Sequence, residues 1–302
     1  MKKSIFLIIT LLSFITLLSG CLSVDSLFDA VYDKTISKVS DKVVDNVVDT
    51  TYDNVEKAVE TIEPEQEYYI GRSVCASILS NFKIYNNKTK QQYMNKILQT
   101  LVLHSERPTL YNGYHLLLLD TDEFNAFATS GGHILITRGL ADSVKSEDEL
   151  AAVIAHEIGH VQNGDAIKSI KANRWTNVVT GVATSAVSAL DEKAGADLSN
   201  MVDDTITTMV NNGFSKTQEY DADKAAVSIL ASSGYNPGAI VEMLKRIQER
   251  EPKDKSKLSG MYKTHPAAED RIKEVTKVLA KVKAPEDTSA MREARFAKNM
   301  GK

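Results

Sequence analysis

The sequence predicts an α+β fold that is mainly helical and contains one small antiparallel sheet. Three observations support this. Apolar residues recur at helical spacing in several segments between residues 65 and 281. Capping residues stand at the heads of these segments. Two apolar segments, 124–129 and 133–137, are separated by Ser130-Gly131-Gly132, and Gly-Gly between apolar segments is typical of a hairpin.

The composition is that of an ordinary folded protein. The chain has 302 residues, of which 43% are hydrophobic and 25% are charged. This excludes a disordered, a collagen-like and a multi-span membrane chain. The formal net charge of -4 provides no basic surface of the kind that nucleic-acid binding requires. We therefore expect no nucleic-acid partner.

The first 20 residues have the pattern of a bacterial export signal. A charged start precedes the apolar run from Ile5 to Leu18, which is shorter than the roughly 20 residues of a membrane-spanning helix. The segment ending in Cys21 resembles the lipoprotein signal box, which implies a lipid on Cys21. The alternative is a plain cleaved signal with a chance cysteine. A lipid would hold the exported chain on a membrane, and Leu22 in place of Asp favours the outer membrane, facing the periplasm, in a cell with two membranes.

Residues 21–64 differ from the rest of the chain in their residue pattern, which predicts a separate N-terminal segment. Valines recur every four residues from Val39 to Val47, which favours an amphipathic helix. This helix either packs on the main domain or serves as a stalk or interaction helix. The main domain is expected over residues 65–283. Residues 284–302 predict a polar tail that we expect to be loose.

Each element of the main domain has a local signal. Residues 65–106 predict two helices, and the unbroken apolar run from His115 to Leu119 predicts a buried strand. Ser146 and Glu149 form a capping box at the head of a helix that ends near Gly164. Further helices are expected at 215–232, from Asn236-Pro237 onward and after Thr264-His265-Pro266.

The helix headed by Ser146 carries His156-Glu157-Ile158-Gly159-His160. Residues four apart lie one turn above each other on one helix face, so both imidazoles can reach one metal ion. The carboxylate of Glu157 reaches a water on that metal rather than the metal itself. Two histidines and a carboxylate suit zinc, so we expect one Zn2+ per chain.

A catalytic zinc needs a third protein ligand, and the best candidate is Glu219 in the helix 215–232. Asp223 lies four residues later on the same face and can accept a hydrogen bond from the second nitrogen of a ligand histidine. Taken alone, these residues are better explained as an acidic first turn that favours the helix dipole. Beside the two-histidine motif, we assign them to the metal site.

Together with Thr264-His265-Pro266 and Arg271, these residues resemble the HtpX and CAAX-prenyl-protease family of zinc metallopeptidases, and more narrowly its soluble, lipoprotein-type periplasmic members. The resemblance covers about Glu65 to Lys281. It implies a zincin-type fold with a glutamate ligand (a gluzincin), zinc bound by His156, His160 and Glu219, and Glu157 as general base.

The same resemblance implies a substrate-binding edge strand at Asn125-Ala126-Phe127-Ala128. An edge strand offers unpaired N–H and C=O groups, to which an extended peptide can add as a further strand. The implied partners are unfolded or extended polypeptides. Plain sheet packing is the alternative for these four residues.

Two features stay open at this point. His265 lies where similar proteins have a histidine near the zinc, either as a regulatory ligand or as a substrate contact; on the sequence alone it is equally a helix-cap histidine. His265 or Arg271 could also stabilise the oxyanion of the reaction. The segment between His160 and Glu219 is either a lid over the site or ordinary helical packing.

With this resemblance, the sequence predicts a lipid-anchored zinc metalloendopeptidase that hydrolyses unfolded or misassembled envelope proteins. The alternative is an envelope assembly factor or chaperone that binds unfolded clients at the same edge strand, with latent or structural zinc. An intact Glu157 favours the enzyme, because a pure binding protein needs no base there.

Overall fold

The computed structural model describes residues 62–169, 171–172, 213–251, 264–265, 268–283, 285–286 and 289–301. The predictions for Cys21, for the valine-rich segment and for a lid in most of the segment between His160 and Glu219 lie outside these residues. Among the described residues, no helix combines the length and the hydropathy that crossing a membrane requires.

A small sheet of three strands has the order β1-β3-β2. β2 (Ala126–Ala128) and β3 (His133–Thr137) form the predicted antiparallel hairpin. The turn between them, Ser130–Gly132, places Gly131 and Gly132 at positive φ, which glycine adopts without strain. β1 (His115–Leu119) pairs with β3 in parallel, so the sheet is mixed and not purely antiparallel as expected.

The central position of β3 accounts for this difference. Ile134, Leu135 and Ile136 are all completely buried, which requires apolar side chains on both faces of the strand. The hairpin turn fixes only the direction of β2 relative to β3. β1 pairs with the other edge of β3, and packing on both faces sets its direction there.

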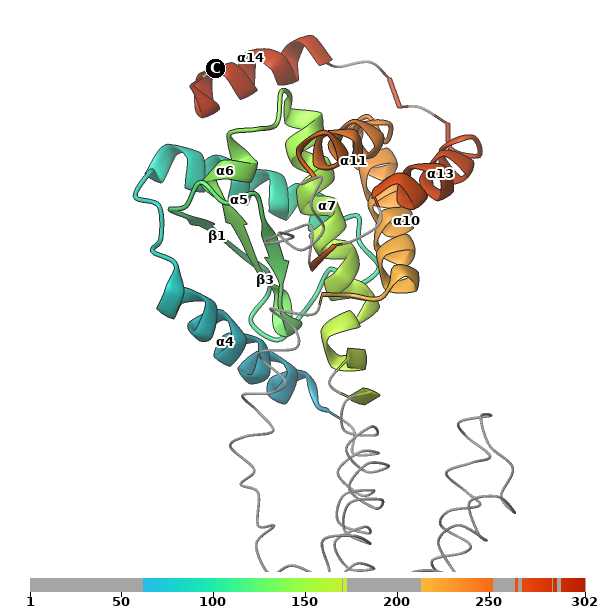
Figure 1. Ribbon diagram of the computed structural model, residues 1–302. Coiled ribbons are helices and arrows are strands. Elements are labelled where there is room, and N and C mark those ends of the chain that lie inside the picture. Colours follow the sequence, from blue (N-terminus) through green and yellow to red (C-terminus); the bar gives the residue numbers. More distant parts are fainter. Residues whose placement is uncertain are drawn as a thin grey trace, which may run out of the picture. The chain divides into compact units, whose positions relative to one another are not determined.

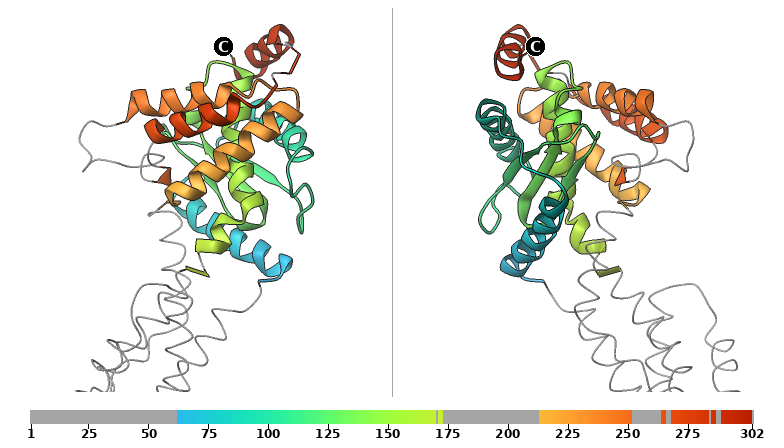
Figure 2. Two further views of the ribbon diagram at one scale, coloured as in Figure 1. Left: turned by 90° about the vertical axis from the view of Figure 1, so that its right-hand side faces the viewer. Right: turned by 60° about the vertical axis from the view of Figure 1, so that its left-hand side comes forward.

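Helices cover both faces of the sheet. α4 packs with the face that carries Phe127 and Leu135, whereas α5 and α7 pack with the opposite face. Figure 1 shows α10, α11 and α13 beyond α7, and Figure 2 shows these three helices from the side. The helices are α4 (Pro64–Asn81), α5 (Lys88–Val102), α6 (Arg138–Ala141), α7 (Glu147–Asn163), α10 (Lys216–Ser232), α11 (Ala239–Arg250), α13 (Ala268–Leu279) and α14 (Ser289–Met300).

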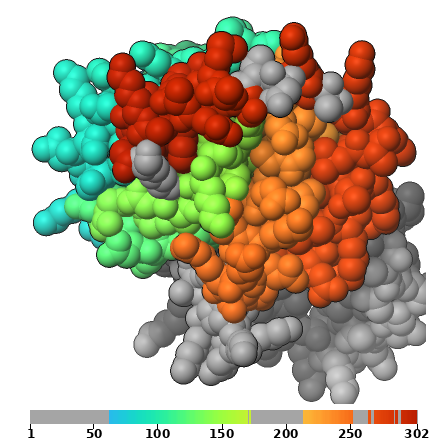
Figure 3. Space-filling view, turned by 90° about the horizontal axis from the view of Figure 1, so that it is seen from above, coloured from blue at the N-terminus to red at the C-terminus, as the bar shows by residue number. Residues whose placement is uncertain are grey.

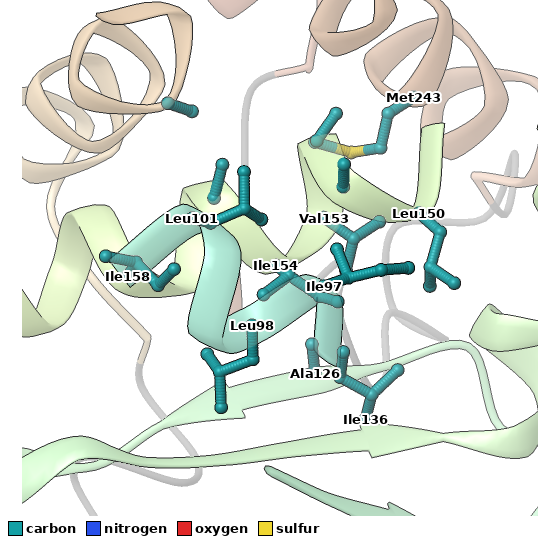
Figure 4. Packing of buried hydrophobic residues seen from close by; sticks show 14 of the residues in the cluster. Ile97, Leu98, Leu101, Ala126, Ile136, Leu150, Val153, Ile154, Ile158 and Met243 are labelled. Carbon is teal, nitrogen blue, oxygen red and sulfur yellow. The ribbon is translucent and has the colours of Figure 1, made fainter. Parts of the chain in front are cut away.

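Helix α7 begins and ends as predicted. The Ser146 side chain accepts a hydrogen bond from the Glu149 N–H, and Gly164 ends the helix in the left-handed conformation at φ 67°. Every residue from Leu150 to Val161 is buried. Figure 4 shows why: side chains of α7 meet those of α5 on one side and the sheet residues Ala126 and Ile136 on another. This burial gives the histidine motif a rigid support.

Residues 289–300, expected in a loose polar tail, form helix α14. Arg292, Phe296 and Met300 recur every four residues and are buried. The helix packs on α5 and α7, and Figure 3 shows it lying on the surface of the domain. This helix was not predicted because one of its three buried positions is the charged Arg292, so its apolar periodicity is weak.

Candidate metal centre

Four side chains from three separate segments meet in the interior of the domain. They are His156 and His160 from α7, Glu219 from α10, and His265. One ligand atom of each lies within 4.8 Å of the others, and none of these residues is more than 3% exposed. His265 therefore belongs to the metal site and is not merely a helix-cap residue.

A close helix crossing brings the ligands together. A Cβ atom at Gly159 would lie 2.7 Å from the Ala222 carbonyl oxygen, so only glycine permits α10 to approach α7 this closely. Ala222 lies between Glu219 and Asp223 in α10. The crossing therefore presents both carboxylates to the histidines of α7. This tertiary contact explains why an acidic first turn becomes part of a metal site.

The distances between the ligand atoms fit a zinc ion. His156 Nε2 lies 3.1 Å from His160 Nε2 and 3.4 Å from His265 Nδ1. Glu219 Oε1 lies 3.3 Å from His160 Nε2 and 2.9 Å from His265 Nδ1. Ligand atoms of a tetrahedral zinc, each at about 2.0–2.1 Å from the ion, lie about 3.3 Å from one another. Three imidazoles and a carboxylate are also the donors that zinc prefers.

A carboxylate orients each histidine of α7. His156 Nδ1 lies 3.0 Å from Asp223 Oδ1, as the sequence predicted for Asp223. His160 Nδ1 lies 2.8 Å from Asp165 Oδ2. Such contacts fix the ring orientation and leave Nε2 free for a metal. Asp165 was not predicted; the signal was the helix-ending Gly164, which turns the chain back so that the next side chain reaches His160.

Arg271 holds the two carboxylates of α10. Its guanidinium lies 2.7 Å from Glu219 Oε2 and donates to both oxygens of Asp223 at 2.7 and 2.8 Å. Burial would raise the pKa of Glu219, but the charges of His265 and Arg271 hold it well below its usual range. Glu219 is thus ionised, as a zinc ligand must be. Arg271 itself is 1% exposed, and it lines a small cavity together with Glu157 and His265.

Glu157 differs from all these residues. It is 0% exposed, and neither carboxylate oxygen has a hydrogen-bond partner among the described residues. His265 Nε2 lies 3.9 Å from Glu157 Oε1. This distance is too long for a hydrogen bond. The carboxylate thus lies beside the four-residue cluster with its lone pairs free.

The predicted strand Asn125–Ala128 lies next to the metal site, at the edge of the sheet. The Thr264 hydroxyl donates to Asn125 Oδ1 at 3.3 Å, so the residue before His265 contacts the start of this strand. The Phe214 N–H donates to the Thr264 carbonyl oxygen, and the Phe214 ring stacks on His160 with a centroid distance of 4.1 Å. These contacts hold Thr264 and His265 beside the strand.

Comparison with known proteins shows which protein family has a similar sequence. A sequence model of peptidase family M48 matches residues 88–279. The beta-barrel assembly-enhancing protease of Escherichia coli is 27% identical over 219 residues, which are 71% of this chain and 44% of that protein. The metalloprotease LoiP of Escherichia coli is 30% identical over 51% of this chain and 58% of its own length.

A mitochondrial relative is similar as well. The metalloendopeptidase OMA1 of Schizosaccharomyces pombe is 25% identical over 65% of this chain and 55% of its own length. The chain thus spans about half the length of the curated relatives it matches.

Proposed function

The chain belongs to peptidase family M48 and is a zinc metallopeptidase, and from this premise we propose that it is a lipid-anchored endopeptidase of the bacterial envelope. Its substrates are unfolded or misassembled polypeptides. Glu157 carries the proposal: a buried carboxylate without a hydrogen-bond partner among the described residues, beside a complete zinc ligand set, is the arrangement that a hydrolytic base requires.

Different residues of the chain have different roles in hydrolysis. When bound, zinc polarises the scissile carbonyl and lowers the pKa of a water molecule to near 7. Glu157 accepts the proton of the attacking water and later passes it to the leaving amine. Asp223 and Asp165 hold the imidazoles of His156 and His160 in place. The rigid support keeps these groups in position during the reaction.

The location in the envelope has separate support. The export pattern and Cys21 favour a lipid-anchored protein outside the cytoplasm. One relative is named a beta-barrel assembly-enhancing protease, which connects a similar chain with proteins that are still being assembled. An edge strand beside the metal site suits such substrates, since only an unfolded or flexible segment can add to it.

A second candidate function rests on His265. In the described arrangement all four zinc positions are taken by protein side chains, which is typical of structural rather than catalytic zinc. An envelope assembly factor or chaperone with latent or structural zinc would have this geometry permanently. An enzyme would instead hold zinc through His156, His160 and Glu219 and keep one position for a water molecule, with His265 beside the metal rather than on it.

Cleavage of an unfolded protein decides between the two. We expect the zinc-loaded full chain to cleave reduced casein and Glu157→Gln to leave it intact. Cleavage by both proteins would point to a contaminating protease. An intact substrate with both proteins, each with zinc bound, would favour the assembly factor unless His265→Ala then cleaves it.

The variant His265→Ala tests latency directly. If the open arrangement is a minor state of about 10% or less, removing His265 raises casein cleavage about tenfold or more. Zinc remains bound through His156, His160 and Glu219 and is measured by metal analysis. A loss of cleavage with zinc retained would instead make His265 a contact that the reaction needs.

A further inference from the structure

Under the proposed function, an extended substrate adds to the outer edge of β2, and the backbone there is prepared for it. The Thr137 N–H donates to the Asn125 carbonyl oxygen, and the Thr129 N–H also donates to β3. Backbone groups alternate in direction along an antiparallel strand. Those of Ala126 and Ala128 therefore point away from β3. The Ala126 N–H donates to Asn125 Oδ1 at 2.9 Å, so the groups left for a substrate strand are the Ala126 carbonyl and the N–H and carbonyl of Ala128.

The side chains of β2 alternate between the two faces of the sheet. Ala126 and Ala128 belong to the apolar cluster that includes α5 and α7, whereas Phe127 belongs to a second cluster with Val74 and Ile78 of α4. A strand added beside β2 follows the same alternation. Its side chains therefore point in turn toward α7, where the metal centre lies, and toward α4.

A narrow groove follows this edge, with β2 as its floor. Its walls come from α4 on one side and from the segment beside the metal on the other. Apart from His265, none of the described residues that line it is ionisable. The lining residues are Val74, Ile78, Ala126, Phe127, Ala128, Thr129, Phe214, Thr264 and His265.

The groove is nearly closed in the described arrangement. Its cavity measures about 20 Å3, which is room for one water molecule and no side chain. Thr264 and His265 form part of the wall. A substrate side chain can therefore enter only after some of the lining side chains have moved.

We propose that the α4 side of this groove is a specificity subsite for one apolar substrate side chain, with Val74, Ile78 and Phe127 as its determinants. This specificity rests on the proposed function. An apolar side chain is stabilised there by burial, whereas a charged one loses its water and meets no partner. Substrate residues on either side point toward α7, so the selection acts on alternate positions.

The first test is a cleavage profile. The zinc-loaded full chain is given a library of peptides randomised around a fixed core, and the products are sequenced. We expect Val, Leu, Ile or Phe to exceed Asp, Glu and Lys by about tenfold to a hundredfold at one position near the scissile bond. A profile that accepts charged and apolar residues equally at every position overturns the subsite.

A size change then assigns the determinants. Ile78→Ala shortens a side chain in the α4 wall and so enlarges the subsite. We expect the substrate preference at this position to move about tenfold toward Phe and Trp. Ile240→Ala in α11 is the matched control, since it deletes the same atoms from an equally buried position away from the groove. Ile78→Val serves if Ile78→Ala does not fold. A shift in both variants, or in neither, contradicts the assignment.

Peptide binding separates failure of the subsite from failure of the function. The same library is bound to Glu157→Gln, and the retained peptides are identified. Binding without cleavage by the wild type overturns the enzyme but leaves the subsite to be judged by the bound peptides. Enrichment of apolar residues that changes with Ile78→Ala supports the subsite. Binding of no peptide overturns both.

Discussion

Helix α7 carries two buried glutamates whose surroundings differ sharply. Glu147 and Glu157 are separated by about 15 Å of helix, and neither is more than 1% exposed. Glu147 accepts hydrogen bonds from Tyr93 at 2.5 Å, Tyr235 at 2.9 Å and Arg295 Nε at 2.7 Å. Glu157 accepts none from the described residues.

This difference indicates that the charge of Glu147 stabilises the fold, whereas the charge of Glu157 does not. Buried carboxylates that stabilise a fold are fully hydrogen-bonded. Leaving such a group without a partner costs about 1–3 kcal/mol or more. A fold tolerates this cost where the lone pairs serve another molecule, since activity and stability often compete at one residue. Glu147 binds α14 to α7 through Arg295, whereas the proposed function gives the lone pairs of Glu157 to a water molecule.

The largest expected effect is on activity at Glu157. Glu157→Gln removes the base and lowers casein cleavage by about 10³-fold or more. Because an unpaired buried charge is also removed, we expect an unfolding free energy equal to or above that of the wild type. Cleavage, zinc content and urea unfolding are measured on the same preparation.

The control for this prediction is His160→Ala, which removes a ligand and should lose zinc and activity together. Equal loss of zinc in Glu157→Gln and His160→Ala would make Glu157 a ligand. The contrast with Glu147 would also break if Glu157→Gln proved strongly destabilising, because Glu157 would then have a structural partner.

The opposite result is expected at the other end of the helix. Glu147→Gln replaces the charged acceptor of Tyr93, Tyr235 and Arg295 by a neutral one. We expect a cost of about 2 kcal/mol in unfolding free energy, because the Arg295 side chain that loses its ion pair is 52% exposed. Zinc content and cleavage by the folded fraction remain unchanged. Glu242→Gln is a matched control, because its partner Lys245 is exposed and the pair contributes less than about 1 kcal/mol. A selective loss of zinc in Glu147→Gln would contradict a purely structural role.

Local signals in the sequence were sufficient for most of the site. The capping residue Ser146 and Gly164 bounded α7 correctly, and the motif placed His156 and His160 on one face. The Gly-Gly turn predicted the hairpin that forms the sheet edge. These features depend on residues within a few positions of one another, where the physical rules are strongest.

Other features depend on contacts between distant segments and were not accessible in this way. The parallel pairing of β1 follows from packing on both faces of β3. The position of Arg271 on Glu219 and Asp223 follows from how α13 lies against α10. Helix α14 is held by Arg295 on Glu147, a pair of residues 148 positions apart. No local pattern encodes such pairs.

A smaller effect is expected from the other partner of Glu147. The Arg295 side chain is 52% exposed, so its ion pair is partly screened by water. In Arg295→Ala, Glu147 keeps the hydroxyls of Tyr93 and Tyr235, and we expect a loss of about 1 kcal/mol in unfolding free energy. Lys298→Ala, at an exposed position of the same helix, should cost less. A loss as large as that of Glu147→Gln would show that the tyrosines contribute little.

The smallest effect is the pH dependence that Glu147 contributes to the unfolding free energy. Burial raises the pKa of Glu147, but the hydrogen bonds from Arg295, Tyr93 and Tyr235 outweigh burial and hold the pKa below its usual 4.5. The folded state therefore binds this proton less readily than the unfolded state. The stability that the ionised carboxylate contributes is present above pH 4.5 and is lost as the pH falls through the folded pKa.

Since glutamine does not titrate, the difference in unfolding free energy between the wild type and Glu147→Gln should be constant near neutral pH and shrink below about pH 4.5. Urea unfolding at pH 7 and pH 4 measures it, and a difference that stays constant across this range would mean that the pKa of Glu147 is the same in the folded and the unfolded protein.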